Sequence, residues 1–312
     1  MKEVNVLSRS INKSVNLYAF EEYLSAQASL LPDLPEIKKI SPRVIRVLGG
    51  NPGLMQLQGT NTYIVGTGSK RILVDTGQGI PQWAQWISSA IEEHGITIEK
   101  VLLTHWHGDH TGGVPDLVRM YPELEGSIFK NRPDAGQNPI SDGEVFETEG
   151  ATIRAVFTPG HSVDHMCFLL EEEEALFTGD NMLGHGTTAV EDLATYMNSL
   201  FVMQKQNCKI GYPGHGEVIG DLKLVMQTEI GRKQRRERQI IAGLKTLQKR
   251  NQGSIGALPR DLVTQVFGDL PDDVVDSIFV PFVKELLMKL AIERRVGFRM
   301  SLGDKLWFVK GG

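Results

Sequence analysis

The residues best suited to chemistry lie between Leu102 and His110, in the segment LLTHWHGDH. A short apolar run, which predicts a buried strand, is followed at once by three histidines and an aspartate. Neutral imidazole and carboxylate groups bind zinc and similar divalent cations, and they fill an apolar core poorly. His105 and His107 stand two apart, so an extended backbone directs both toward one metal ion. Asp109 and His110 follow at a turn and are predicted to bind a second ion nearby.

Three polar residues farther along the chain complete this set. His161, Asp180 and His215 each follow a short apolar run and are each reached through a glycine, which lets the backbone turn sharply and approach an ion. Because such runs predict strands, we expect the three side chains at sheet edges that face one cleft. The predicted assignment is one ion on His105, His107 and His161, a second on Asp109, His110 and His215, and Asp180 as the bridge.

Two divalent cations are therefore the expected cofactors, with Zn²⁺ favoured and Mn²⁺ as the alternative. Two ions roughly 3.5 to 4 Å apart hold a bridging hydroxide at neutral pH and polarise the carbonyl that it attacks. A thioester expels a thiolate whose conjugate acid has a pKa near ~8.5, so it needs little help from an acid. A phosphodiester expels a more basic alkoxide and depends more on a placed proton donor. The ligand residues alone allow either reaction.

Two further histidines, His165 and His185, fall near the predicted ligand loops. Each could orient substrate or hold a metal ligand in place, and a structural histidine is the alternative for both. The two cysteines, Cys167 and Cys208, are too few for a disulfide framework and lack zinc-site spacing, which favours a reducing compartment.

Short β-branched runs between turn residues predict two sets of strands. The first set comprises 44–48, 62–65, 71–74 and 97–103, and its first three members are expected to be antiparallel in one sheet. The second set comprises 127–130, 144–147, 152–157, 166–170, 175–178 and 208–211, with the acidic residues 171–174 as a solvated hairpin tip. Helices are predicted at 81–93, 115–120 and 191–206. These elements indicate an α+β class, with two sheets packed face to face and helices outside.

Composition predicts three parts of the chain. Residues 1–42 are expected to form an arm packed on the main body, with a short helix or arm at 14–30 and an extended lead-in set by prolines. Residues 43–222 form the predicted catalytic domain. Residues 223–312 are expected to form a mainly helical, winged-helix-like domain, with helices at 228–250, 258–267 and 274–293 and a hairpin around 301–303.

The helix predicted at 228–250 is strongly basic from Arg232 to Arg250. Three interpretations stay open: a solvated face, a docking surface for an acidic carrier protein with its phosphopantetheine arm, and a contact with the RNA backbone. The 312-residue chain as a whole has a net charge of −5 and gives no sign of a nucleic-acid or anionic-membrane partner. No apolar run approaches the ~20 residues that cross a bilayer, and no secretory signal is expected, so we predict a cytoplasmic location.

The ligand pattern resembles the metallo-β-lactamase superfamily over roughly residues 43 to 220. The resemblance rests on His105-Trp-His107-Gly-Asp109-His110, Gly160-His161, Gly179-Asp180 and Gly214-His215. It implies a four-layer αβ/βα sandwich with a dinuclear site at the sheet edges, and a role for Asp109 in proton transfer, which we rank second to ligation. True β-lactamases usually lack a histidine in the place of His110, so antibiotic hydrolysis is disfavoured. Thioesterases, glyoxalase-II-like enzymes and metallo-ribonucleases remain.

A narrower resemblance concerns residues 47–53, 57–63 and 75–81, which are similar to a subgroup with fungal thioesterases and a mitochondrial β-lactamase-like endoribonuclease. The stretches 23–27, 31–35, 40–44, 164–168 and 184–187 resemble the fungal thioesterases. This likeness implies hydrolysis, in trans, of a polyketide thioester on the acyl-carrier-protein domain of a non-reducing polyketide synthase, releasing an acid like atrochrysone carboxylic acid. The alternative is a metal-dependent endoribonuclease acting on single-stranded RNA. A metal-bound scaffold without activity is disfavoured, because every expected ligand is present.

Overall fold

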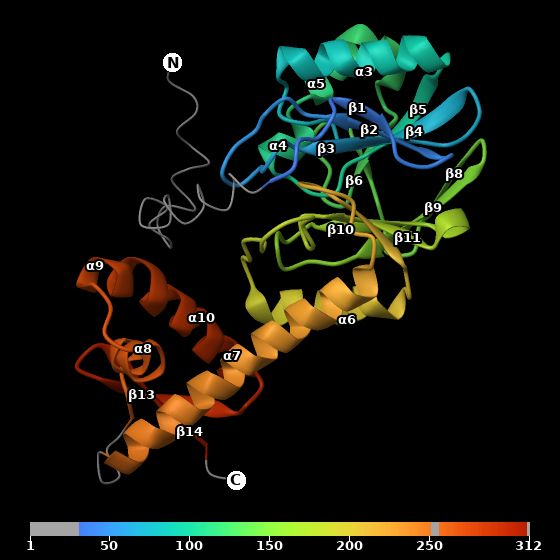
Figure 1. Ribbon diagram of the computed structural model, residues 1–312. Helices are drawn as coiled ribbons and strands as arrows, with labels where there is room; N and C mark the ends of the chain where they lie inside the picture. The colour runs from blue at the N-terminus through green and yellow to red at the C-terminus, as the bar shows by residue number, and fades with distance from the viewer. Residues whose placement is uncertain (1–30, 251–255, 311–312) are drawn as a thin grey trace. The chain divides into compact units, whose positions relative to one another are not determined.

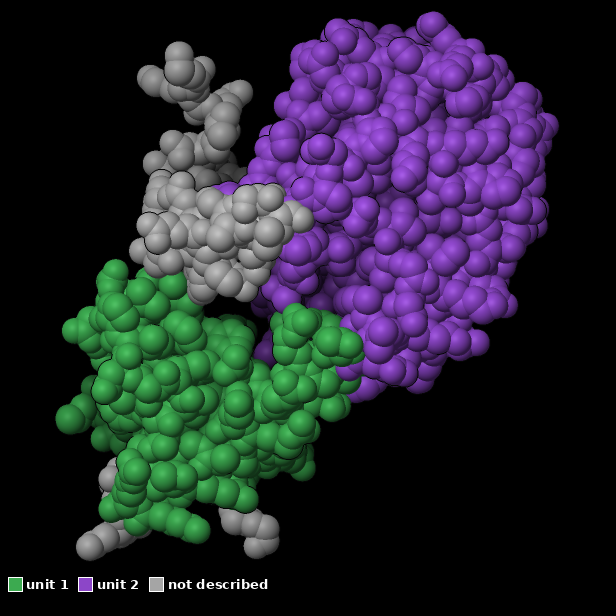
Figure 2. Space-filling view, in the orientation of Figure 1, with its two compact units in different colours: residues 1–26, 228–312 green, residues 27–227 purple. Residues whose placement is uncertain are grey.

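The computed structural model describes residues 31–250 and 256–310. The helix or arm predicted at 14–30 lies outside these residues. The chain divides into two compact units, one of residues 27–227 and the other containing residues 228–312 (Figure 2). The domain boundaries predicted at residues 42 and 222 stay predictions.

The first sheet of the larger unit has seven strands in the order β1 to β7. They are β1 (Ile37–Lys39), β2 (Val44–Leu48), β3 (Asn61–Val65), β4 (Lys70–Val74), β5 (Thr97–Leu102), β6 (Ile128–Lys130) and β7 (Asn138–Pro139). Strands β1 to β4 pair antiparallel, as predicted for 44–48, 62–65 and 71–74. From β4 onward the pairing is parallel, because helix α3 (Pro81–His94) and then helix α5 (Val114–Met120) carry the chain back between successive strands.

The second sheet has five strands in the order β12-β11-β10-β9-β8. They are β8 (Val145–Thr148), β9 (Ala151–Phe157), β10 (Met166–Leu170), β11 (Ala175–Gly179) and β12 (Ile210–Pro213). Helix α6 (Leu193–Lys205) connects β11 to the parallel β12, and the other neighbours are antiparallel. The strand predicted at 127–130 was wrongly grouped with this sheet, because its parallel partner is β5.

The acidic residues 171–174 form the turn between β10 and β11, as predicted, and several of them have ionic or hydrogen-bonded partners. Glu171 accepts a hydrogen bond from Arg154 (2.8 Å), and Glu174 pairs with Lys209 (2.5 Å). Glu173 accepts from the hydroxyl of Tyr212 at 2.7 Å. Basic and hydroxyl groups of neighbouring segments therefore contact this turn, and none of its four glutamates is buried, as expected for a solvated tip.

Two apolar layers hold the larger unit together. One lies between the sheets and contains Tyr63, Leu102, Phe168 and Phe177. The other lies on the opposite face of the first sheet, where Trp83 of α3 is fully buried. Figure 1 shows α3 and α5 over the first sheet and α6 beneath the second, which gives helix, sheet, sheet, helix. The predicted α+β sandwich is confirmed.

The second unit is mainly helical. It contains most of α7 (Leu222–Arg250), then α8 (Pro259–Phe267), α9 (Asp272–Val274), a π-helical turn (Val275–Phe279), α10 (Val280–Ile292) and the hairpin of β13 (Val296–Ser301) and β14 (Asp304–Val309). Helix α7 begins at Leu222 and not at 228, because Asp221 accepts a hydrogen bond from the Leu224 amide (3.0 Å) and caps it. The single helix predicted at 274–293 is instead split by the π-helical turn. Pro281, just after this turn, lacks the backbone N–H that an α-helix needs.

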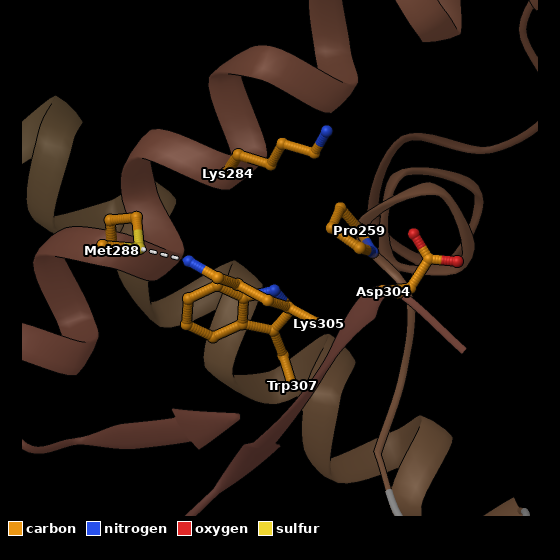
Figure 3. A pocket seen from close by; sticks show the side chains of 7 residues that line it. Pro259, Lys284, Met288, Asp304, Lys305 and Trp307 are labelled. Carbon is orange, nitrogen blue, oxygen red and sulfur yellow. Dashed lines mark hydrogen bonds between the residues drawn. The ribbon is translucent and has the colours of Figure 1, made fainter. Parts of the chain in front are cut away.

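A cavity of about 320 Å³ lies in this unit (Figure 3). It is lined by Pro259, Lys284, Met288, Gly303, Asp304, Lys305 and Trp307. Lys305 Nζ contacts the sulfur of Met288 (3.8 Å) and lies over the ring of Phe298 (4.6 Å). The lining has no histidine or cysteine, so it offers no metal site of the kind predicted from the sequence. Among residues 31–250 and 256–310, no helix is both long and apolar enough to span a membrane.

Candidate metal centre

The predicted ligands lie in loops that follow strands of both sheets. His105 and His107 follow β5, and the short helix α4 (Gly108–Thr111) carries Asp109 and His110. His161 follows β9, Asp180 follows β11, and His215 follows β12. Because these strand ends meet at one edge of the sandwich, residues far apart in the chain come together. All seven form two groups, one of His105, His107, His161 and Asp180 and the other of Asp109, His110 and His215.

The first group has three ring nitrogens in close approach. His105 Nε2 lies 2.9 Å from His107 Nδ1, and His161 Nε2 lies 3.2 Å and 3.0 Å from these two atoms. His161 Nδ1 donates to the carbonyl of Ala189 (2.8 Å), which leaves the lone pair of Nε2 facing the group. His105 is held likewise, because its Nδ1 lies 2.9 Å from Thr104 Oγ1.

The second group is joined to the first through Asp180. Asp109 Oδ2 lies 3.3 Å from His215 Nε2 and 3.7 Å from His110 Nε2. Asp180 Oδ1 lies 3.3 Å from His110 Nε2 and 3.4 Å from His215 Nε2, while its Oδ2 lies 3.6 Å from His161 Nε2. The two oxygens of one carboxylate thus face different groups, which is the geometry of a bridging ligand.

The residues present fit a pair of divalent cations. His110 Nε2 and Asp180 Oδ1 are buried and lie 3.3 Å apart, but neither makes a hydrogen bond of good geometry within the described part of the chain, and such atoms are costly unless they bind something. The donor set is imidazole nitrogen and carboxylate oxygen, which suits zinc. The role of these residues as ligands stays a prediction.

Burial and neighbouring histidines keep two rings of the first group, His105 and His107, neutral. Burial, reinforced by His110 and His161, lowers the pKa of His105 well below its usual value. Burial and the neighbouring His161 lower the pKa of His107 to about 4. Both rings therefore carry a free lone pair at neutral pH, as metal binding requires.

The second group attracts positive charge. Burial alone would lower the pKa of His215, but Asp180 and Asp109 outweigh it and raise the value to about 9. The pKa of His110 is raised for the same reason. Burial would raise the pKa of Asp109, but His110 and His215 lower it, so the carboxylate stays ionised. The carboxylates of Asp109 and Asp180 therefore favour positive charge beside His110 and His215.

Asp75 and Thr104, which the sequence did not single out, hold the ligand rings in place. Asp75 Oδ2 accepts from His110 Nδ1 (2.8 Å), and Asp75 Oδ1 accepts from the Thr104 amide (2.8 Å). Asp75 is buried and has a φ of 59°, a value uncommon outside glycine. It directly follows β4, the parallel neighbour of β5. That placement beside the histidine cluster was the signal that could have revealed it.

The two additional histidines differ. His165 is fully buried, its Nε2 accepts from the Asp180 amide (3.1 Å), and its Nδ1 donates to Thr158 Oγ1 (3.0 Å). It therefore supports the backbone of Asp180, and a role in orienting substrate stays a prediction. His185 is half-buried beside Gly184, whose amide donates to the His215 carbonyl (2.9 Å). Its ring has no hydrogen bond to any residue that the structure describes, and its role stays a prediction.

Apolar side chains are exposed on the loops around the metal groups. Trp106 is 38% exposed, and its ring lies edge-on to His107 at 4.5 Å between ring centroids. Val163, two residues after His161, is 48% exposed. Leu54 and Met55 are exposed on a turn before β3, and Thr60 beyond that turn forms a β-bridge with His215. The residues Leu54, Met55, Trp106 and Val163 are called the apolar rim below.

Comparisons with known proteins agree with this geometry. Residues 56–215 match the Metallo-beta-lactamase superfamily. The atrochrysone carboxyl ACP thioesterase of Aspergillus fumigatus is 58% identical, over 94% of this chain and 95% of its own. The lactamase-like protein ptaB of Pestalotiopsis fici is 55% identical, over 96% of each chain. The atrochrysone carboxyl ACP thioesterase of Aspergillus chevalieri is 52% identical, over 98% of this chain and 99% of its own.

Solved structures show the fold alone. A beta-lactamase domain protein from Burkholderia ambifaria superposes with a TM-score of 0.69 at 15% identity, over 89% of this chain and 95% of its own. A metallo-beta-lactamase family protein from Thermus thermophilus gives a TM-score of 0.58 at 20% identity, over 89% of this chain and 99% of its own. The resemblances to the superfamily and to the fungal thioesterases are both confirmed.

Proposed function

The chain belongs to the metallo-β-lactamase superfamily, and from this premise we propose that it is a metal-dependent thioesterase acting on acyl chains held by an acyl carrier protein. The observation that carries the proposal is the identity of 52–58% with atrochrysone carboxyl ACP thioesterases, which extends over nearly the whole chain. The relatives named above include no ribonuclease, so cleavage of single-stranded RNA is not favoured.

The proposed substrate is a polyketide thioester on the carrier domain of a non-reducing polyketide synthase, and the product is a carboxylic acid of the atrochrysone carboxylic acid type. The apolar rim favours this substrate class, because its side chains offer contact surface to a flat, largely apolar acyl chain. Trp106 offers a partly exposed indole beside His107, and Val163 and Met55 offer aliphatic surface on other loops. Aromatic side chains bind planar groups by offset or edge-on contact, so the rim would hold the acyl chain with its carbonyl toward the ligand groups.

The reaction adds water across the thioester. The water oxygen forms a bond with the carbonyl carbon, the carbon–sulfur bond breaks, and the pantetheine sulfur leaves as a thiolate and takes up a proton. When bound, the cations, which we propose to be two Zn²⁺ ions, supply Lewis acidity and lower the pKa of water. His105, His107 and His161 would hold one ion, Asp109, His110 and His215 the other, and Asp180 both.

Asp109 would also move protons between the site and solvent. Its side chain is 15% exposed, compared with 10% for Asp180, so it is the more accessible of the two carboxylates. Its lowered pKa keeps it deprotonated at neutral pH, with burial opposing this shift and His110 and His215 producing it. A carboxylate with a lowered pKa holds a proton only weakly, so ligation stays its first role and proton transfer its second, and the low pKa of the thiol makes a strong acid unnecessary.

The proposed location is the cytoplasm. Cys167 and Cys208 are both buried and unpaired. Burial raises the pKa of Cys167 to about 12 and that of Cys208 to about 11, so neither is a ready nucleophile or metal ligand. Two unpaired thiols support a reducing compartment.

The test is release of acid from an acyl-loaded carrier domain by the purified protein, with and without chelator. We expect His107→Ala and Asp109→Asn to abolish release while the folded content, measured by circular dichroism, stays unchanged. Turnover by both variants, after metal analysis, would reject the proposal. Chelator-sensitive cleavage of single-stranded RNA without acid release would instead support the nuclease.

A further inference from the structure

Helix α7 has a face on which all charged side chains are positive. Arg235, Arg238, Lys245 and Lys249 are all exposed and are spaced by three, seven and four residues. At 3.6 residues per turn, these positions fall within roughly 80° of one another around the helix and extend over about 21 Å. We call these four residues the basic stripe.

Several other cations of α7 have partners within the unit. Arg232 and Lys233 pair with Glu229 at 3.1 Å and 3.2 Å. Arg236 lies over the ring of Phe267, with the guanidinium carbon 4.8 Å from the ring centroid. The basic stripe has neither hydrogen bond nor ion pair to any residue in the described ranges, so its charge is not used within the fold.

No acid of α7 is available to neutralise the basic stripe. Its two glutamates, Glu229 and Glu237, are buried. Glu237 pairs with the buried Lys289 (2.6 Å) and with Arg295 (2.7 Å). Like charges three or four residues apart destabilise a helix, as between Arg235 and Arg238 and between Lys245 and Lys249. On a chain with a net charge of −5, this local row of cations favours an acidic partner.

We propose that the basic stripe docks the acidic face of the acyl carrier protein, an inference that rests on the proposed function and adds a partner-binding surface to it. A protein partner is favoured over RNA by the composition of the face. Single-stranded RNA sites combine cations with aromatic side chains that stack on bases, whereas the residue between Arg238 and Lys245 on this face is the exposed Ala242. A small residue between cations allows the close approach of another helix.

Docking of this kind acts on encounter and affinity and not on the chemical step. Charges exposed at an interface raise the association rate and are screened by salt. The basic stripe is therefore expected to lower KM for the carrier-bound substrate and to leave kcat unchanged. A small thioester without the carrier protein would be hydrolysed independently of the basic stripe.

The experiment compares two substrates with the same acyl group, 2-naphthoyl carrier domain and 2-naphthoyl pantetheine. The variant is Arg235→Glu with Arg238→Glu, and the matched control is Lys38→Glu with Lys39→Glu, which makes the same charge change on the exposed strand β1. For the stripe variant we expect kcat/KM on the carrier substrate to fall by about tenfold or more at low salt. Hydrolysis of the pantetheine thioester should match that of the unmodified protein, and the control should resemble it on both substrates.

Direct binding keeps the test independent of catalysis. The fluorescence anisotropy of a labelled carrier domain should rise with the unmodified protein and with the control, and much less with the stripe variant. Equal binding by all three proteins would overturn the docking proposal even where hydrolysis is intact. Binding that depends on the basic stripe, with no hydrolysis of either substrate, would uphold docking and reject the proposed function. Salt-dependent binding of single-stranded RNA that requires the basic stripe, without carrier binding, would assign the surface to RNA and overturn the proposal.

Discussion

Replacing Asp75 by asparagine should weaken metal binding and should also lower the stability of the fold. Asp75 accepts from His110 Nδ1 at 2.8 Å, which fixes the ring tautomer with a free lone pair on Nε2. The side-chain amide of asparagine can accept from the Thr104 amide through its oxygen, but its NH₂ group would then face His110. To accept that donor, His110 must move its proton to Nε2, where it blocks the metal.

These contacts set the expected losses of metal affinity and of folding stability in Asp75→Asn. Loss of an outer partner of a metal ligand costs about 10- to 100-fold in metal affinity, which is about 1.4–2.7 kcal/mol. Loss of a buried hydrogen bond to a carboxylate costs about 1.5–3 kcal/mol of folding stability. Asparagine tolerates the positive φ of 59° at this position, so the backbone adds little strain.

The assay is titration of the metal-free protein with Zn²⁺ against a competing chelator, together with kcat on the carrier substrate. We expect Asp75→Asn to bind one equivalent with nearly unchanged affinity and the second more weakly by the factor above, with a parallel loss of kcat at limiting zinc. Thr104→Ser, which retains the hydroxyl that donates to Asp75 (2.9 Å), is the matched control and should bind both equivalents. Unchanged affinity for both ions in Asp75→Asn would refute the tautomer argument.

Three further predictions follow from the same site. Trp106→Ala should raise KM for an aromatic acyl thioester by about tenfold, which corresponds to the loss of about 1.4 kcal/mol of contact between aromatic rings. Trp106→Phe should change this KM little, and Trp106→Ala should change the KM for an acetyl thioester little. Equal effects of Trp106→Ala on both acyl groups would contradict a role of the apolar rim in binding the acyl chain. Gly160→Ala should lower folding stability by about 1–3 kcal/mol in chemical denaturation, because a Cβ would lie 2.4 Å from the backbone of Tyr196 at a φ of 131°; an unchanged midpoint would show that the His161 loop is free to move. Without metal, the pKa of His215 is raised from 6.5 to about 9, so its stabilising contribution is complete below about pH 6.5 and is lost as the pH rises through about 9. The metal-free protein should therefore melt at a lower temperature at about pH 10 than at about pH 6, and His215→Asn should reduce this difference, whereas a melting temperature that rises with pH would contradict the arrangement.

The ligand residues could be predicted because metal binding needs residue types that an apolar core excludes. His105 and His107 stand directly after a buried strand, and His161, Asp180 and His215 follow glycines at strand ends. The sequence could therefore indicate which residues gather, and the fold explains why they do.

Other features depended on contacts that no local pattern contains. The three residues of β6 do not reveal that their partner is β5, so this strand was grouped with the wrong sheet. Asp75 follows a strand as many aspartates do, and only the position of His110 gives it a role. Among the cations of α7, the sequence alone could not separate Arg232, which pairs with Glu229, from Arg235, which pairs with no residue that the structure describes, because both belong to the same basic run.

The central claim is that paired cations held by these residues hydrolyse a carrier-bound thioester. It is tested most directly by the rate of acid release from an acyl-loaded carrier domain as zinc is returned, in steps, to the metal-free protein. We predict no release without metal and a rate that reaches its maximum only at two equivalents. A full rate in the metal-free protein, or a maximum already reached at one equivalent, would contradict the account.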